Sequence, residues 1–192
     1  MAALYVRANT VIGIAGTGWN NTASAVDGSY GALNASYAWW TSAVSSDIAT
    51  IDLGFGTLIS SVIPANAVVT DLMMGFRTYT TNVSMHFAPT LQLYDGTTAV
   101  GPAQGSGNSV AVFTVMLRAN VGNIGYNMVL PTTAQIRSST FKGRIQFARG
   151  VGTTSTTSYL DFFDMAIYYV NYPVSDPVVT GGYTTSTMVG AP

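Results

Sequence analysis

The 192 residues of this chain suffice for one domain with a sizeable core, and without cysteine that domain has neither disulfides nor thiolate metal sites. Charged residues make up 8% of the chain, against about 25% in a typical soluble domain, and the formal net charge is -1. Such a balance gives no electrostatic attraction for nucleic acid or acidic lipid, so we expect neither nucleic acid nor a membrane as a partner.

The residue types that are scarce favour a fold made of strands. All eight acidic residues are aspartate, and Lys142 is the only lysine. Glutamate and lysine normally solvate the exposed faces of helices, whereas the abundant Gly, Thr, Ser, Val and Tyr suit strands and turns. No apolar run approaches the roughly 20 residues of a membrane-spanning helix, and residues 1–7 do not resemble a signal peptide.

The first half of the chain predicts an edge element and two strands. Residues 1–14 alternate loosely and are predicted to be an N-terminal arm or edge strand, and residues 37–40 a strand or covering loop. Residues 47–55 are predicted to be a strand with one apolar face. The stretch Ile63–Arg77 begins as a Pro-Ala-Asn-Ala turn and continues as an alternating strand, with a β-bulge predicted near Thr70-Asp71.

The second half predicts further strands and one helical turn. The predicted strands are residues 86–94, 109–117, 141–147 and 159–172. Because residues 109–117 are apolar on both faces, we expect an internal strand or one covered by a neighbour. A Gly-rich loop is predicted over residues 102–108, and a helical turn over residues 132–138.

Together these elements predict an all-β fold, an antiparallel β-sandwich with extended N- and C-terminal arms. The predicted domain covers residues 15–172, preceded by the segment 1–14 and followed by an extended tail, residues 173–192. The predicted core consists of ten apolar side chains from five strands: Ile51, Leu53, Leu72, Met74, Phe76, Ile145, Phe147, Phe163, Met165 and Ile167.

The order of several short motifs resembles a β-sandwich module of tailed-bacteriophage virion structural proteins, over residues 16–172. The motifs are Gly18-Trp19-Asn20-Asn21, Asp27-Gly28-Ser29-Tyr30, Gly54-Phe55-Gly56, Pro64-Ala65-Asn66-Ala67, Phe141-Lys142-Gly143-Arg144-Ile145 and the strand from Leu160 to Tyr169. One departure is Asp71, where the module more often has glycine after the corner.

The resemblance implies a jelly-roll-like domain located in a virion, as a capsid decoration, tail or fibre protein. It supplies no catalytic residues. The favoured function is a surface or capsid decoration protein, held to a major capsid or tail protein by apolar and backbone contacts. The nearly uncharged terminal segments favour a homo-oligomer, with a trimer as the preferred order, whose arms contact neighbouring subunits.

The titratable residues do not predict an enzyme, a cofactor or a metal site. His86 is the only histidine and lies in an apolar strand, where a structural role is favoured. No nucleophile or acid–base constellation can be assembled around it. The pairs Asp47/Asp52 and Asp161/Asp164 offer oxygen ligands for calcium, but solvation of turns and strand edges is the favoured interpretation.

Four aromatic residues remain as candidates for a functional surface: Tyr30, Tyr37, Trp39 and Trp40. Aromatic faces can pack against the C–H groups of sugar rings, which supports an alternative function as a carbohydrate-binding, host-recognition module of a tail or fibre. These residues could instead cover the end of the sandwich or meet a neighbouring subunit, where aromatic residues are enriched, and that interpretation is favoured.

Overall fold

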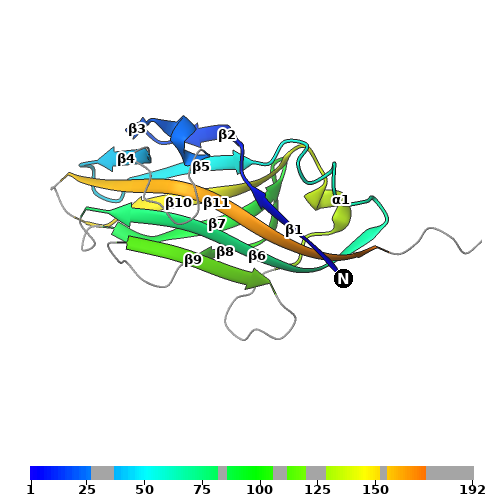
Figure 1. Cartoon of the computed structure of the whole chain (residues 1–192). Coiled ribbons are helices and arrows are strands. Elements are labelled where there is room, and N and C mark those ends of the chain that lie inside the picture. The colour runs from blue at the N-terminus through cyan, green and yellow to red at the C-terminus, as the bar shows by residue number, and fades with distance from the viewer. Residues whose placement is uncertain (27–36, 82–85, 106–111, 120–128, 152–154, 172–192) are drawn as a thin grey trace, which may run out of the picture.

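The chain folds as two antiparallel sheets packed face to face, an all-β, jelly-roll-like sandwich as predicted (Figure 1). The computed structural model describes residues 1–26, 37–81, 86–105, 112–119, 129–151 and 155–171, with the backbone alone for 86–88 and 112–119. The six-stranded sheet has the order β3 (Trp19–Asn20), β4 (Ala38–Ser42), β11 (Thr156–Asn171), β6 (Ala67–Thr80), β9 (Val112–Ala119), and β1 (Ala2–Arg7) also pairs with β11. The five-stranded sheet has the order β2 (Thr10–Ala15), β5 (Ile48–Gly54), β10 (Phe141–Arg149), β7 (His86–Asp95), β8 (Thr98–Gly105).

The long pair β6 and β11 forms the centre of the six-stranded sheet, and each strand of the pair contains a bulge. On β6, Asp71 pairs with Tyr168 and Val69 with Tyr169, so Thr70 is the extra residue, which confirms the bulge expected at this position. On β11, Leu160 pairs with Thr78 and Phe162 with Arg77, so Asp161 is the extra residue. This second bulge was not predicted from the sequence, and it changes which residues share a face.

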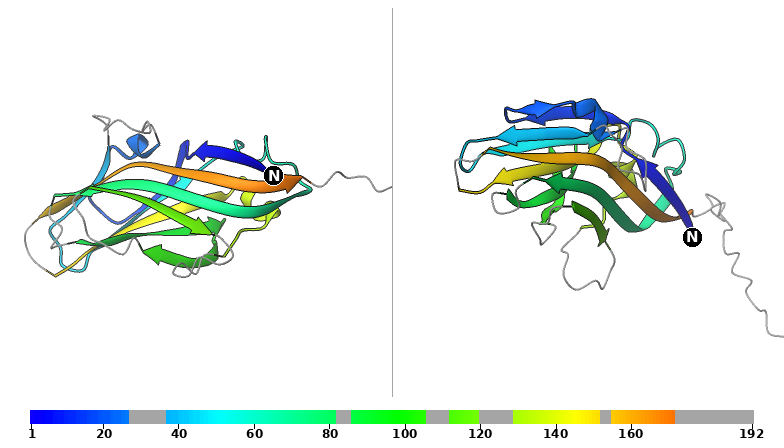
Figure 2. Two further views of the ribbon diagram at one scale, coloured as in Figure 1. Left: turned by 60° about the horizontal axis from the view of Figure 1, so that its bottom comes forward. Right: turned by 60° about the vertical axis from the view of Figure 1, so that its left-hand side comes forward.

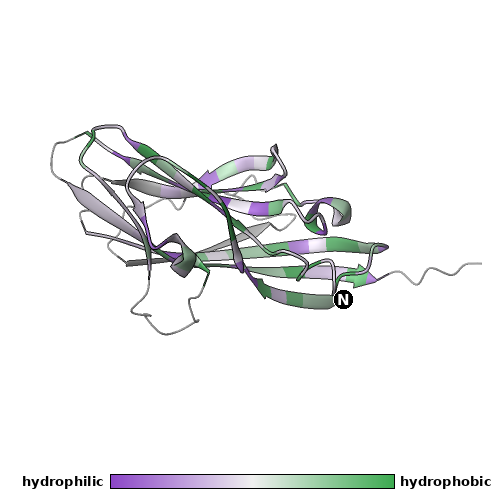
Figure 3. Ribbon diagram, turned by 90° about the horizontal axis from the view of Figure 1, so that it is seen from above, coloured by the Kyte–Doolittle hydropathy of each residue, from purple (hydrophilic) through white to green (hydrophobic). Residues whose placement is uncertain are grey.

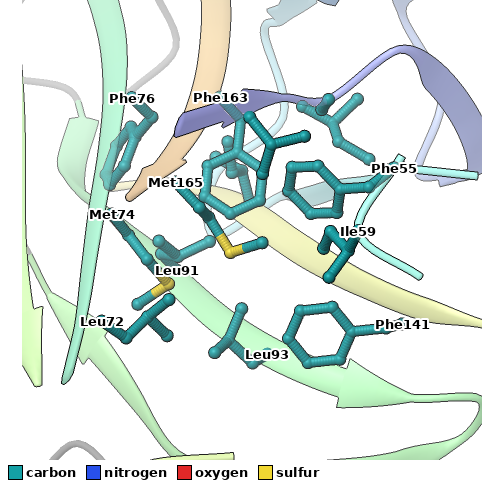
Figure 4. Packing of buried hydrophobic residues seen from close by; sticks show 14 of the residues in the cluster. Phe55, Ile59, Leu72, Met74, Phe76, Leu91, Leu93, Phe141, Phe163 and Met165 are labelled. Atoms are coloured by element: carbon teal, nitrogen blue, oxygen red, sulfur yellow. The ribbon is translucent and has the colours of Figure 1, made fainter. Parts of the chain in front are cut away.

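The core lies between the two sheets, and all ten predicted core side chains belong to it. Figure 4 shows Phe163 and Met165 of β11 meeting Phe55, Leu91 and Leu93 from the opposite side. The alternation of apolar and polar residues that places these side chains inward is visible along the ribbons of Figure 3.

The N-terminal segment pairs with both sheets of its own sandwich. β1 pairs with residues 164–169 of β11, and β2 pairs with β5 on the other sheet (Figure 2). Of the two predicted alternatives the edge strand is therefore correct. Val6 and Ala8 are buried in the core cluster, and this burial explains why the segment is apolar and nearly uncharged.

Of the other local predictions, some are confirmed and some are wrong. Residues 132–138 contain the expected helical turn, α1 (Thr133–Ile136), with Thr132 in a capping box with Gln135; a 3-10 turn, η1 (Thr22–Ala25), was not predicted. The loop expected over 102–108 is wrong for its first residues, because β8 continues to Gly105 as an edge strand that tolerates Pro102. The strand expected over 109–117 is β9, and in the described sheet it is an edge strand and not an internal one.

The predicted tail 173–192 and the motif Asp27-Gly28-Ser29-Tyr30 fall outside the described residues. Within the described ranges, no helix is long and apolar enough to cross a membrane.

Candidate ligand-binding face

The candidate site is the outer face of the six-stranded sheet, the face that points away from the second sheet. Three aromatic residues lie there side by side across three strands, since Tyr159 of β11 pairs with Trp39 of β4 on one edge and with Tyr79 of β6 on the other. We call Trp39, Tyr159 and Tyr79 the aromatic row. The alternation of each strand points these side chains outward, while their neighbours Trp40, Leu160 and Thr80 are buried on the inner face.

The bulge at Asp161 makes this arrangement possible. Phe163, Met165 and Ile167 are odd-numbered and face the core, so Tyr159 would also face inward if β11 kept one phase. The extra residue shifts the phase, and Tyr159 therefore shares the outer face with Asp164 and Ala166.

The two tyrosine rings of the aromatic row contact each other, and the row leaves surface accessible. The ring centroids of Tyr79 and Tyr159 are 5.5 Å apart and tilted by 37°. Tyr37, just before β4, meets Tyr159 edge to face at 5.9 Å. Trp39 and Tyr159 are half-buried, and 40% of Tyr79 is exposed. Such a surface suits a partner with a flat apolar face and polar edges, and a sugar ring has this shape and polarity.

The four aromatic residues that the sequence offered as candidates lie in different environments in the structure. Trp39 and Tyr37 lie at the outer face. Trp40 is fully buried, packs on Phe147 and donates its indole N–H to the carbonyl oxygen of Thr17 over 2.9 Å, so its ring cannot be a binding platform. Trp40 was therefore a wrong candidate for a surface role, since adjacent strand residues point to opposite faces. Tyr30 lies outside the described residues.

Two arginine–aspartate pairs continue the same face along β11. Arg7 donates two hydrogen bonds to Asp164, 2.7 and 2.8 Å long, and its guanidinium lies 5.2 Å from the ring centre of Phe162. The hydrogen bond to Asp164 raises the pKa of Arg7 above its usual value. Arg77 lies 3.8 Å from the buried carboxylate of Asp161. Fixed guanidinium and carboxylate groups of this kind can offer directional hydrogen bonds to hydroxyl groups.

A groove of about 600 Å³ begins at the Arg7–Asp164 pair, where β1, β11 and β6 run side by side. Tyr5 and Arg7 line it from β1, Met73 and Gly75 from β6, and Asp164, Ala166 and Tyr168 from β11. We call this feature the groove. Its size falls within the range of small-molecule sites, and its lining is mainly apolar with one charged pair, as is common for such sites.

The outer face of the five-stranded sheet contains a charge cluster, which consists of Asp52, Lys142 and Arg144. Asp52 accepts two hydrogen bonds from Arg144, of 2.6 and 2.9 Å, and forms an ion pair of 2.8 Å with Lys142. Arg144 also lies 4.6 Å from the ring centre of Tyr94. Burial raises the pKa of Asp52, but hydrogen bonds from Arg144 and Lys142, with their charges, outweigh burial and hold the pKa below its ordinary value.

These contacts bear on the two aspartate pairs that were considered as calcium ligands. Asp52 is ion-paired with two cations and Asp164 with Arg7, while Asp47 accepts hydrogen bonds from the Ser42 hydroxyl and the Ile48 backbone N–H. Within the described residues there is no group of three or more side chains that could hold a metal ion. The side chain of His86 is not described.

Tyr5, Tyr79 and Tyr159 were missed as candidates from the sequence. Trp39 and Tyr79 lie on either side of Tyr159 because both pair with it, and this row joins strands that are 40 and 80 residues apart in the chain. The alternation of each strand carried some signal, because Tyr79 and Arg77 are in the outward phase of β6. The bulge on β11 removed that signal for Tyr159.

Comparison with known proteins gives remote structural likenesses only. No family profile matches the chain, and no curated protein matches it. A Stig cyclase from Fischerella sp. TAU is 11% identical with a TM-score of 0.42, over 87% of this chain and 86% of that one. A family 35 carbohydrate-binding module from Clostridium thermocellum is 12% identical with a TM-score of 0.35, over 86% of this chain and 98% of that one.

A third solved structure is the enzymatically active domain of tailspike protein 4 of bacteriophage CBA120. It is 10% identical with a TM-score of 0.37, and the match covers 84% of this chain. The chain spans about a fifth, 19%, of that tailspike domain. At these identities and scores the likenesses do not assign a function.

Proposed function

We propose that this domain binds a neutral carbohydrate on the outer face of its six-stranded sheet. The observation that carries the proposal is the aromatic row, in which Trp39, Tyr159 and Tyr79 lie in register across β4, β11 and β6. A rigid sheet holds the three rings, so a sugar would be bound with little loss of side-chain freedom. The neighbouring Arg7–Asp164 pair, which is partly exposed, and the Arg77 guanidinium supply polar groups for its hydroxyls.

The charge of the sheet supports a neutral ligand. Its six strands contain three arginines and three aspartates, so the sheet carries no net charge from its own residues; these are Arg7, Arg77, Arg118, Asp71, Asp161 and Asp164. A nucleic acid or a polyanionic glycan would be bound by an excess of cations, which this sheet lacks.

Binding without catalysis is part of the proposal. Hydrolysis of a glycosidic bond requires two carboxyl groups with separate acid and base roles. The two aspartates nearest the aromatic row, Asp161 and Asp164, each face an arginine, which suits a structural or binding role. In the setting implied by the resemblance in the sequence, the domain would serve host recognition on a virion.

A glycan array tests the proposal directly. The wild-type domain should give signals on neutral glycans, and Trp39→Ala should reduce those signals at least about tenfold, because one side of the stacking surface is removed. Trp39→Phe keeps an aromatic ring and should retain part of the binding. Incubation with any glycan that binds should release no reducing ends.

Tyr94→Ala provides the matched control, because Tyr94 is a half-buried aromatic residue on the outer face of the opposite sheet. This variant should bind as the wild type does. Thermal unfolding of each variant separates loss of binding from loss of fold. A blank array, or equal binding by Trp39→Ala and wild type, would refute the proposal.

A virion-surface structural role is the second candidate function. The observation that favours it is the uncharged edge strand β2, with 46% of Ile12 and 53% of Ile14 exposed. An open, apolar edge can pair with a strand of another chain. We propose a trimer assembled through this edge as the testable form of the role. Light scattering would show a trimer for the wild type and a monomer for Ile12→Lys, whereas a monomeric wild type would exclude it.

A further inference from the structure

The groove and the aromatic row lie on one face and along one strand. Tyr159 of the row and Ala166 of the groove are both outward-facing residues of β11. Six paired positions separate them once the extra residue Asp161 is left out, and at about 3.3 Å per residue the separation is roughly 20 Å. This distance exceeds the length of one sugar ring, so a single sugar could not reach both features.

The segment between the two features is suited to the same kind of ligand. Phe162 lies on the outer face beneath the Arg7 guanidinium, and the pairs Arg7–Asp164 and Arg77–Asp161 flank it. A chain that crosses this segment would therefore meet the partly exposed Arg7–Asp164 pair between two apolar contact areas.

The groove itself is shaped by side chains of three strands. Ala166 pairs with Tyr5 on one side and with Met73 on the other, so a small residue lies between two larger ones. Tyr5 is 74% exposed, and Tyr168 lies half-buried at the far end, where its hydroxyl is 3.7 Å from the sulfur of Met73. An exposed tyrosine beside a small residue leaves an open aromatic face along which a sugar ring can lie.

We propose that the groove is a second subsite for the same glycan, so that the domain binds an oligosaccharide laid along β11 from the aromatic row to Tyr5 and not a single terminal sugar. The inference rests on the proposed function. The occupant is a neutral oligosaccharide, because the charges of the sheet balance and the groove contains one internally paired arginine and aspartate. Binding strength must then increase with the length of the glycan, since only longer chains contact both subsites.

Isothermal titration with oligosaccharides of increasing length tests the inference. The probes are the xylo-, cello- and malto-oligosaccharides from disaccharide to hexasaccharide, together with the length series of any neutral glycan that the array identifies. Affinity should increase from disaccharide to hexasaccharide. Tyr5→Ala should lower the hexasaccharide affinity about threefold to tenfold and leave the disaccharide affinity unchanged.

A second variant fills the groove and keeps the tyrosine. Ala166→Phe should likewise reduce the affinity for hexasaccharides alone, because its ring occupies the space between Tyr5 and Met73. Tyr94→Ala is again the matched control, since Tyr94 is a half-buried tyrosine on the outer face of the other sheet. It should leave every affinity at the wild-type value.

The outcomes distinguish this inference from the proposed function. If Trp39→Ala abolishes binding but affinity is independent of length and of Tyr5, the aromatic row binds sugar and the second subsite does not exist. If Tyr5→Ala instead changes the oligomeric state measured by light scattering, the groove is a contact between copies of the chain, and the inference is wrong. If none of the probes binds, both proposals fail.

Discussion

The packing of the two sheets gives the sharpest test of the fold, at Gly143 on the inner side of β10. A Cβ atom at this position would collide with the Phe163 ring of the opposite sheet, touching Cε1 and lying 2.6 Å from Cζ and 3.1 Å from Cδ1. Carbon atoms in contact are normally about 3.5–4.0 Å apart, so the ring would have to move by about 1 Å. Phe163 is fully buried, and its ring centre lies 5.4 Å from that of Phe55, which leaves little room for the movement (Figure 4).

We therefore expect Gly143→Ala to lower the free energy of unfolding by about 1–2 kcal/mol. Overpacking of a core costs about 1–3 kcal/mol, and the restricted unfolded chain of alanine returns about 0.5–1 kcal/mol. Urea unfolding followed by circular dichroism measures the change. Adding Phe163→Leu to Gly143→Ala should cost less than the sum of the two single changes, because the smaller side chain relieves the collision.

Gly105→Ala is the matched control, a glycine in strand β8 whose added Cβ would have no atom within 4 Å. Its effect should stay within about 0.5 kcal/mol. If Gly143→Ala were equally neutral, Gly143 would not face Phe163, and the register of the sandwich described above would be wrong.

Two further predictions concern the charge cluster and the N-terminal strand. Because the folded pKa of Asp52 is lowered, its contribution to stability is complete above its unfolded pKa, near pH 4, and is lost as the pH falls through the folded value. Wild-type stability should therefore fall more steeply than that of Asp52→Asn in urea titrations below about pH 4, and parallel curves would contradict this linkage. Removal of residues 1–9 deletes β1 with Val6 and Ala8 and uncovers Phe162. The free energy of unfolding should therefore fall by at least about 3 kcal/mol. A shortened chain as stable as the full one would show that β1 is not part of the sandwich.

The strands could be predicted from sequence wherever one phase of alternation is maintained. In β10, Phe141, Gly143, Ile145 and Phe147 face inward and Lys142, Arg144 and Gln146 face outward, as the pattern indicates. The bulge at Thr70 was also predictable, because Val69 and Leu72 are both apolar and three positions apart. The bulge at Asp161 was not, since Leu160, Phe162 and Phe163 are all apolar and do not reveal a phase change.

The candidate site was predictable only in part, for the same physical reason. The pair Trp39-Trp40 drew attention to the right strand, but a strand has two faces and the sequence of β4 alone does not say which tryptophan is buried. Tyr5 was assigned to an arm, because a short apolar segment looks alike whether it pairs with its own sheet or with a neighbour's. β4 pairs with residues 156–160 of β11 and leaves the edge of residues 164–169 free for β1 to pair with. Only the tertiary structure shows that this edge is available.

The indole N–H signals of the three tryptophans provide the most direct test of glycan binding at the outer face. Trp19 and Trp40 donate their indole N–H groups to the carbonyl oxygens of Ala15 and Thr17, and Trp39 belongs to the aromatic row. In a nuclear magnetic resonance titration of the labelled protein with a neutral hexasaccharide that binds, the Trp39 signal should shift strongly while the other two stay nearly unchanged. Binding that left the Trp39 signal in place, or that shifted residues of the five-stranded sheet instead, would contradict the account.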